Sequence, residues 1–317
     1  MSSNDGARSF LAGLVDYAGL FPPAALPLGP ALAEYARHRA GPGAWMLGRF
    51  VVPASRLEAL AGTLATDPFL AGRRSWRLAV LSGAPELPAA LAAIAAQADA
   101  IVACEQGGPG GLTVEALELP LPAKAGAAGA LAEALADEGL GGRDLCLEVG
   151  ADVEAALDGI AAAAADWSGP SGAFPQLGAK LRCGGVTADA FPAPSRVVAV
   201  IGGCALRGLP LKFTAGLHHP VRHLSAEPAV MMHGFLNVVG AALLANAGID
   251  DPAVLLGCVE ETDPAAFRLD RGGFAWRDHV VAAAAVARAR AGLVGGFGSC
   301  SFDEPRQDLV DLGLLPS

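Results

Sequence analysis

The chain has 317 residues, of which 53% are hydrophobic and 17% charged, so it contains enough apolar material for one large buried core. Its formal net charge of −10, without any basic run, argues against nucleic acid as a partner. The few positive charges that stand close together, at Lys180, Arg182, Lys212 and Arg222, predict instead a small anionic metabolite as the partner. Six scattered cysteines without a CxxC pair indicate reduced thiols, as in a cytoplasmic protein.

Neither export nor a membrane is predicted. The first ten residues, MSSNDGARSF, lack the charged region and the following apolar region of a signal peptide. The longest apolar stretch, residues 230–247, is interrupted by His233 and Asn237, which argues against a membrane span. The composition is compatible with a homo-oligomer as well as with a monomer.

The chain begins with an apolar segment, residues 10–26, that predicts either an N-terminal strand or a lid helix. Residues 30–39 predict a helix, with Pro30 in its first turn and basic residues in its last. From residue 49 onward β-type runs alternate with helical segments, and Ser55 is placed to cap the first of these helices. The expected strands are 49–53, 76–81, 100–104, 113–119, 144–149, 179–183, 209–217 and 297–302, with a Gly-Gly hairpin at 267–276. The expected helices are 55–65, 85–97, 127–136, 153–165, a Val/Ile/Ala segment between 183 and 209, 230–247, 252–259 and 278–291.

This alternation predicts a parallel sheet covered by helices. Nine strand candidates suit a closed (β/α)8 barrel of the TIM type with one additional strand better than an open sheet. A doubly wound nucleotide-binding fold lacks support, because no GxGxxG motif follows the first strand and no GxxxxGK[ST] motif occurs. We therefore expect a single barrel domain over residues 1–317, with a small hairpin insertion at approximately 250–277.

The charged side chains on two of these strands are the main candidates for chemistry. On an extended strand Lys180 and Arg182 share one face, and Lys212, Thr214 and His218 share another. Unpaired charge is costly in a core, so these residues predict a pocket at the strand ends. A lysine beside a second cation loses proton affinity and can form a Schiff base, with Lys212 as the imine-forming residue and Lys180 as its cationic neighbour. The alternatives are that the three cations only bind a phosphate or carboxylate, or that they form salt bridges inside the barrel.

Histidines and carboxylates extend the candidate set. His218 is expected to act as a general acid or base, and Glu148, at the end of its strand, to support the lysines. Because HHP is not a typical metal-binding spacing, no cofactor is expected; the alternative is a divalent metal held by His218, His233, Glu148 and Glu304.

The remaining binding residues surround this set. Arg182 and Thr214 are expected to bind substrate together with His233, and the backbone of Gly184 and Gly185 to cradle an anion. Glu118 is more simply a structural partner of Lys180 or Arg182, and Cys300 is left out of the chemistry because no partner histidine can be assigned from the sequence.

Five phrases, DYAGLFPPA, KLRCGG, KFTAGLHHP, MHGFLNV and FGSCSFDEP, resemble those of an uncharacterised bacterial protein family. The resemblance covers nearly the whole chain and implies no activity. The arrangement of two lysines is also similar in kind to that of the deoxyribose-phosphate aldolase group of barrels, in which one lysine forms the imine and another tunes it; the surrounding motifs differ.

The sequence as a whole predicts a barrel enzyme, a lyase of aldolase type or an isomerase, that acts on a small phosphorylated or carboxylated carbonyl substrate. The two alternatives are a divalent-metal-dependent hydrolase or isomerase, and an accessory protein that binds an anion without chemistry.

Overall fold

The computed structural model describes residues 5–67, 69–70, 76–107, 111–169, 171–227 and 229–316. Eight parallel strands form a closed barrel in the order β1-β13-β7-β6-β5-β4-β3-β2. The fold class expected from the sequence, a (β/α)8 barrel, is thereby confirmed. The barrel strands are β1 (Val15–Tyr17), β2 (Leu47–Pro53), β3 (Trp76–Leu81), β4 (Leu112–Pro120), β5 (Asp144–Glu148), β6 (Leu177–Arg182), β7 (Leu211–Thr214) and β13 (Val294–Ser299).

Helices connect these strands. They are α1 (Asp5–Leu11), α2 (Leu28–Ala40), α3 (Leu57–Thr66), α4 (Leu87–Gly107), α5 (Ala127–Asp137), α6 (Val153–Trp167), α7 (Pro194–Arg207), α8 (Phe235–Asn246), α9 (Pro252–Glu260), α10 (Ala283–Gly292) and α11 (Asp303–Asp311). The chain divides into two compact units. Unit 1 comprises Met1–Asp16, Trp45–Leu47 and Leu181–Ser317, and unit 2 comprises Tyr17–Ala44 and Gly48–Lys180.

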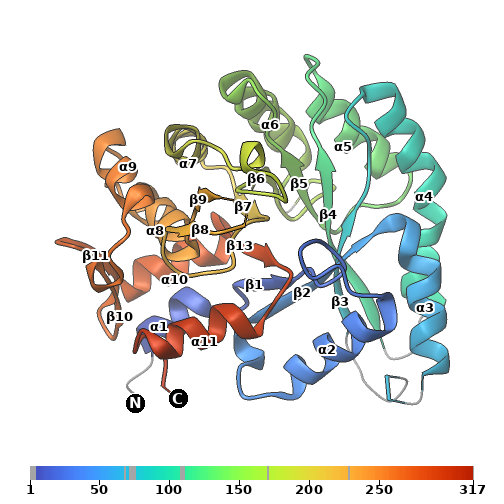
Figure 1. Ribbon diagram of the computed structural model, residues 1–317. Helices are drawn as coiled ribbons and strands as arrows, with labels where there is room; N and C mark the ends of the chain where they lie inside the picture. The colour runs from blue at the N-terminus through green and yellow to red at the C-terminus, as the bar shows by residue number, and fades with distance from the viewer. Residues whose placement is uncertain are drawn as a thin grey trace. The chain divides into compact units, whose positions relative to one another are not determined.

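Unit 2 contains the regular β–α alternation. Strands β3, β4 and β5 pair in parallel, and α3, α4 and α5 follow one another along them (Figure 1). Within α4, residues Leu87–Gln106 are long and apolar enough to cross a membrane by length and composition. In the structure α4 packs between α3 and α5 and against β4, as one of the helices that surround the barrel.

A charge network joins the strands of unit 2 near their N-terminal ends. Arg49 donates hydrogen bonds to Glu115 Oε2 (3.0 Å) and to Asp144 Oδ2 (2.7 Å). Arg77 donates to both oxygens of Glu115, at 2.7 and 2.9 Å. Burial alone would raise the pKa of Glu115, but the hydrogen bonds from Arg77 and Arg49 outweigh it and hold that pKa below 4.5.

We expect Glu115→Gln to make the protein less stable at neutral pH but not in acid. A carboxyl whose pKa is lowered by folding contributes stability above its unfolded pKa, and this contribution is lost as the pH falls through the folded value. The loss at pH 7 should be about 1 kcal/mol, because the network is partly exposed to solvent. Urea-unfolding midpoints of wild type, Glu115→Gln and the exposed control Glu133→Gln, measured between pH 7 and pH 3, test this. A difference from wild type that persists unchanged at pH 3 would contradict it.

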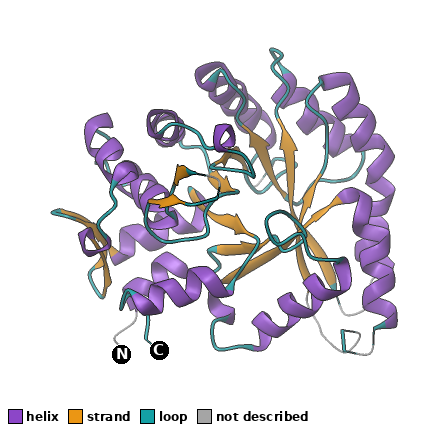
Figure 2. Ribbon diagram, viewed as in Figure 1, coloured by secondary structure: helices purple, strands orange, loops and turns teal. Residues whose placement is uncertain are grey.

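Unit 1 also contains two small sheets, formed by the part of the chain between β7 and β13. Strands β10 (Phe267–Asp270), β11 (Gly273–Trp276) and β12 (His279–Ala282) form an antiparallel sheet that contacts α1 and α10 (Figure 2). Strands β8 (His223–Ser225) and β9 (Val230–Met232) form a two-stranded ribbon. The expected hairpin at 267–276 is confirmed, and β12 extends it to three strands.

Several expected elements differ in the structure. Residues 100–104 are not a strand but the last part of α4, because the alanine-rich run before them continues the helix without a break. Residues 230–247 are not one helix: Val230–Met232 pair with β8, and α8 begins after Gly234. The described residues contain thirteen strands rather than nine. In the barrel, β1 is present and the expected strand 100–104 is absent; the further strands lie in the two small sheets of unit 1.

Other element boundaries also differ, as in the following cases. Ser55 lies in a short 3-10 helix, Ala54–Arg56, and does not cap α3, whose N-cap is Arg56. The helix expected from residue 278 begins at Ala283, since β12 occupies the residues before it. The N-terminal segment is resolved in favour of a strand, because β1 (Val15–Tyr17) takes part in the barrel.

Candidate active site

Unit 1 contains a buried ion pair between the barrel strands β1 and β7. Lys212, on β7, places its Nζ atom 2.5 Å from Oδ2 of Asp16, on β1. The two side chains are only 4% and 7% exposed. Taking both charges out of water costs free energy that a hydrophobic pair of the same volume would not cost, so a buried pair of this kind is a candidate functional site.

Glycines on β13 allow this pair to form across the intervening strand. In the barrel β13 lies between β1 and β7. The ring of Phe297 stacks on Phe235 of α8, with centroids 4.9 Å apart, so the alternate positions Gly296 and Gly298 face the opposite side of the strand. A Cβ atom at Gly296 would collide with the carbonyl oxygen of Leu14. No side chain of β13 therefore stands between Lys212 and Asp16.

Arg290 holds the backbone around this ion pair. Its guanidinium donates hydrogen bonds to the carbonyl oxygens of Phe10 and Ala12, both at 3.0 Å, and to that of Val294 at 2.5 Å. Burial lowers the pKa of Arg290 to about 10, against the opposing field of Asp16. Arg290 thus ties the segment that precedes β1 to the start of β13.

A second buried lysine lies in unit 2 between two glutamates. Lys180 Nζ is 3.2 Å from Glu118 Oε2 and 3.0 Å from Glu148 Oε2. The Glu118 side chain is 2% exposed and that of Glu148 is 29% exposed. Burial would lower the pKa of Lys180, but the fields of Glu118 and Glu148 outweigh it and raise that pKa above 10.5. Glu118 thus forms the ion pair with Lys180 that was expected of it as a structural residue. The catalytic role of Lys180 stays a prediction.

The lysines of this chain are unusual in number and place. The sequence contains only three, Lys124, Lys180 and Lys212, and two of them are buried against carboxylates. Lysine is the residue that proteins most readily leave in solvent. Two buried lysines out of three indicate that the ammonium groups are needed where they lie.

Histidines in the loop after β7 meet acidic residues of α11. His218 Nδ1 lies 3.6 Å from Glu304 Oε2 and 3.8 Å from Cys300 Sγ. Its neighbour His219 contacts Asp308 Oδ2 at 2.6 Å, and Glu304 and Asp308 are one helical turn apart. Burial lowers the pKa of His218 below 6.5, so its imidazole is neutral at pH 7 and can accept a proton. The structure gives Cys300 the histidine neighbour that the sequence did not reveal.

His233 belongs to a scaffold of hydrogen bonds. Its Nε2 lies 2.8 Å from the carbonyl oxygen of Pro192, and its Nδ1 lies 3.3 Å from Nη1 of Arg222. Asn237 accepts a hydrogen bond from the Arg222 amide and donates to the carbonyl oxygens of Cys258, in the last turn of α9, and of Glu261, just after it. His233 lies before α8 rather than on a helix, and both of its ring nitrogens are engaged. Throughout the described ranges no group of three or more His, Cys, Asp and Glu side chains is arranged to hold a metal ion.

The KLRCGG segment is packed tightly against the loop after β7. A Cβ atom at Gly184 would lie 2.8 Å from Cα of Gly216 and 2.5 Å from the Phe191 ring. Arg182 is exposed and donates its Nε–H to the carbonyl oxygen of Gly184, at 3.0 Å. Close packing therefore explains Gly184, and the roles of Arg182, Gly184 and Gly185 in anion binding stay predictions.

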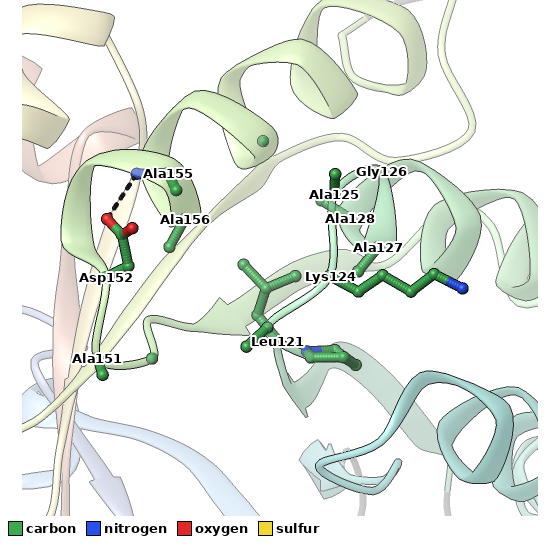
Figure 3. A pocket seen from close by; sticks show the side chains of 14 residues that line it. Leu121, Lys124, Ala125, Gly126, Ala127, Ala128, Ala151, Asp152, Ala155 and Ala156 are labelled. Atoms are coloured by element: carbon green, nitrogen blue, oxygen red, sulfur yellow. Dashed lines mark hydrogen bonds between the residues drawn. The ribbon is translucent and has the colours of Figure 1, made fainter.

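A pocket of about 450 Å³ lies elsewhere in unit 2, between the loops that follow β4 and β5. It is lined mainly by alanine and glycine from the starts of α5 and α6 (Figure 3). Lys124 extends away from Asp152, whose carboxylate caps α6 by accepting from the Ala155 amide. None of the residues expected to carry chemistry lines this pocket.

Two contacts of the predicted residues are not apparent from the sequence: Asp16 as the acid opposite Lys212, and Cys300 as the neighbour of His218. A single acidic residue inside the apolar run LVDYAGL was the available signal for Asp16. A comparison with protein-family models finds none that matches the chain, and a comparison with curated proteins finds no match either. The fold and site define the class of protein, a (β/α)8 barrel with buried lysine–carboxylate pairs, a fold that commonly serves enzymes.

Proposed function

We propose that the protein is a barrel enzyme, a lyase of aldolase type or an isomerase, that acts on a small phosphorylated or carboxylated carbonyl compound through an imine on Lys212. The observation that carries the proposal is the buried pair of Lys212 and Asp16, 2.5 Å apart on two barrel strands. A lysine enclosed in this way is shielded from water, and a base in contact with it can remove its proton.

All three protons of the Lys212 ammonium are accounted for when the imine forms. The Lys212 ammonium gives up two protons, the first to Asp16, as its nitrogen lone pair bonds to the carbonyl carbon. The C=O π pair moves to the oxygen, and the oxygen leaves as water with those two protons. The third proton stays on the C=N nitrogen. The protonated imine then accepts the electron pair of a bond broken at the neighbouring carbon, a C–C bond in a lyase or a C–H bond in an isomerase.

The other residues have supporting roles in this proposal. His218 is neutral at pH 7 and exchanges protons with the substrate. Arg182 binds the anionic group, Lys180 is held as a cation by Glu118 and Glu148, and Glu148 fixes its position.

We expect sodium borohydride to trap a covalent adduct on Lys212 when the protein is incubated with small aldehydes, ketones and sugar phosphates. Intact mass gives the stoichiometry, and peptide mapping gives the site. Because the chain has three lysines, the assignment is direct, and the exposed Lys124 measures non-specific reductive alkylation. The Lys124→Arg variant should form the same adduct and Lys212→Arg should form none. An adduct confined to Lys124 across the whole panel would refute imine chemistry at the buried lysine.

A further inference from the structure

The hydroxyl of Thr214 is buried and has no hydrogen-bond partner among the described residues. Its Oγ1 atom is shielded from solvent, and none of the described residues forms a hydrogen bond with it. Buried polar atoms in folded proteins are nearly always hydrogen-bonded, and an exception calls for an explanation such as a ligand. Thr214 is the last residue of β7, at the end of the barrel where such folds bind their substrates.

Thr214 shares the face of β7 with Lys212. The two residues are two positions apart, and on a strand this places their Cα atoms roughly 7 Å apart with their side chains on the same side. A molecule bonded to Lys212 that extends toward the end of the strand therefore reaches Thr214.

Gly298, the residue that pairs with Thr214 on β13, provides space for such a molecule. Gly295 and Gly296 are required by close contacts with the backbone of β7 and of the segment before β1, where a Cβ atom would lie too close to the carbonyl oxygens of Leu211 and Leu14. Gly298 is different, since a Cβ atom there would lie 3.9 Å from Thr214 Cγ2, an ordinary van der Waals distance. Its φ angle also lies outside the left-handed region. Backbone geometry therefore does not explain this glycine, whereas space beside the Thr214 side chain does.

We infer that Thr214 and Gly298 form a subsite for a hydroxyl group on the carbon next to the reacting carbonyl, so that the substrate is a short α-hydroxy aldehyde or ketone. A neutral hydroxyl that both donates and accepts is the natural partner of the Thr214 hydroxyl. The inference rests on the proposed function and names the substrate class of the same site.

The test compares hydroxyacetone with acetone on wild type, Thr214→Val, Thr214→Ser and Gly298→Ala. Equilibrium binding is followed by ligand-observed NMR, and the imine by borohydride trapping at Lys212. Wild type should prefer hydroxyacetone about ten-fold, because a site built for a hydroxyl discriminates against the analogue that lacks it. Thr214→Val, which keeps the shape of the side chain, should lose this preference, and Thr214→Ser should keep it. Gly298→Ala should bind hydroxyacetone about ten-fold more weakly with an unchanged or higher unfolding midpoint.

The outcomes separate this inference from the proposed function. If wild type binds hydroxyacetone no better than acetone, or if Thr214→Val keeps the preference, the subsite is refuted even when Lys212 forms an adduct. If Thr214→Val loses the preference but no variant forms an adduct, the subsite stands and the imine chemistry is refuted.

Discussion

Lys212→Met is expected to form no borohydride adduct, to lose all turnover and to be less stable by about 3 kcal/mol. The first two effects follow from the loss of the amine. The third follows because the carboxylate of Asp16, which is 7% exposed, loses the ammonium 2.5 Å away from it. Breaking one side of a buried ion pair costs several kcal/mol, since the remaining charge keeps its desolvation penalty. Urea unfolding followed by circular dichroism gives the free energy of unfolding, and mass spectrometry gives the adduct.

The double variant Asp16→Asn/Lys212→Met separates chemistry from stability. Removing both charges removes the uncompensated carboxylate, so we expect most of the lost stability to return while the adduct and the turnover stay absent. Recovery of turnover in the double variant would show that the pair is structural. Stability of the single variant equal to that of wild type would show that Asp16 is not a desolvated partner of Lys212.

The barrel was predictable because its strands carry their own signal. Runs such as WRLAVL and DLCLEV are apolar, rich in β-branched or large aliphatic residues and separated by helical segments, so the parallel order follows from local patterns. The extra strands β8 and β9 have three residues each, which is too short for any periodicity to show. The run AIVAC has strand composition, but it continues an alanine-rich helix, and the long-range pairing that would make it a strand does not form.

Individual residues of the candidate site could be predicted from the sequence, but not all of the contacts between them. Lys180 and Lys212 stood out because charge inside an apolar strand is costly and must have a purpose. The partner of Lys212 was hidden, because Asp16 is 196 positions away from Lys212 in the chain and meets it only through the order of the barrel strands. Glu118 and Glu148, in contrast, were already candidate partners of Lys180 in the sequence. Lys180, expected as the cationic neighbour of Lys212, has Glu118 and Glu148 as its direct partners, and their fields raise its pKa. The direct partner of Lys212 is a carboxylate, that of Asp16.

The role of a glycine is the hardest to predict from the sequence alone. The run VGGFGS contains three glycines that the sequence does not distinguish. At the first two a Cβ atom would collide with backbone atoms, whereas at Gly298 it would not. The difference depends on how far the neighbouring strands approach β13, which is a property of the folded barrel. The same holds for the Thr214 hydroxyl: that no described residue forms a hydrogen bond with it cannot be read from its sequence neighbours.

Lys180→Met is expected to destabilise the protein by about 3–5 kcal/mol, through the two glutamates of unit 2 that it leaves behind. The Glu118 side chain is 2% exposed and has Lys180 Nζ at 3.2 Å, so without the lysine its carboxylate is both desolvated and repelled by Glu148. Folding raises the pKa of Lys180, which fixes the pH dependence. The stability that the lysine supplies is fully present below its unfolded pKa of 10.5 and is lost as the pH rises through the raised folded value. The difference in unfolding free energy between wild type and Lys180→Met should therefore be constant from pH 7 to pH 10 and shrink only above that range.

The matched variants assign the cost to one carboxylate. Glu118→Gln/Lys180→Met should recover most of the stability, and Glu148→Gln/Lys180→Met should recover less, because the Glu148 side chain is 29% exposed and keeps part of its hydration. Equal recovery in both would show that repulsion between the two glutamates, rather than desolvation of Glu118, dominates the cost. If the stable double variant Glu118→Gln/Lys180→Met also retains full turnover, Lys180 is a structural cation and the chemistry belongs to Lys212 alone; if it folds but is inactive, the ammonium of Lys180 takes part in binding or in proton transfer.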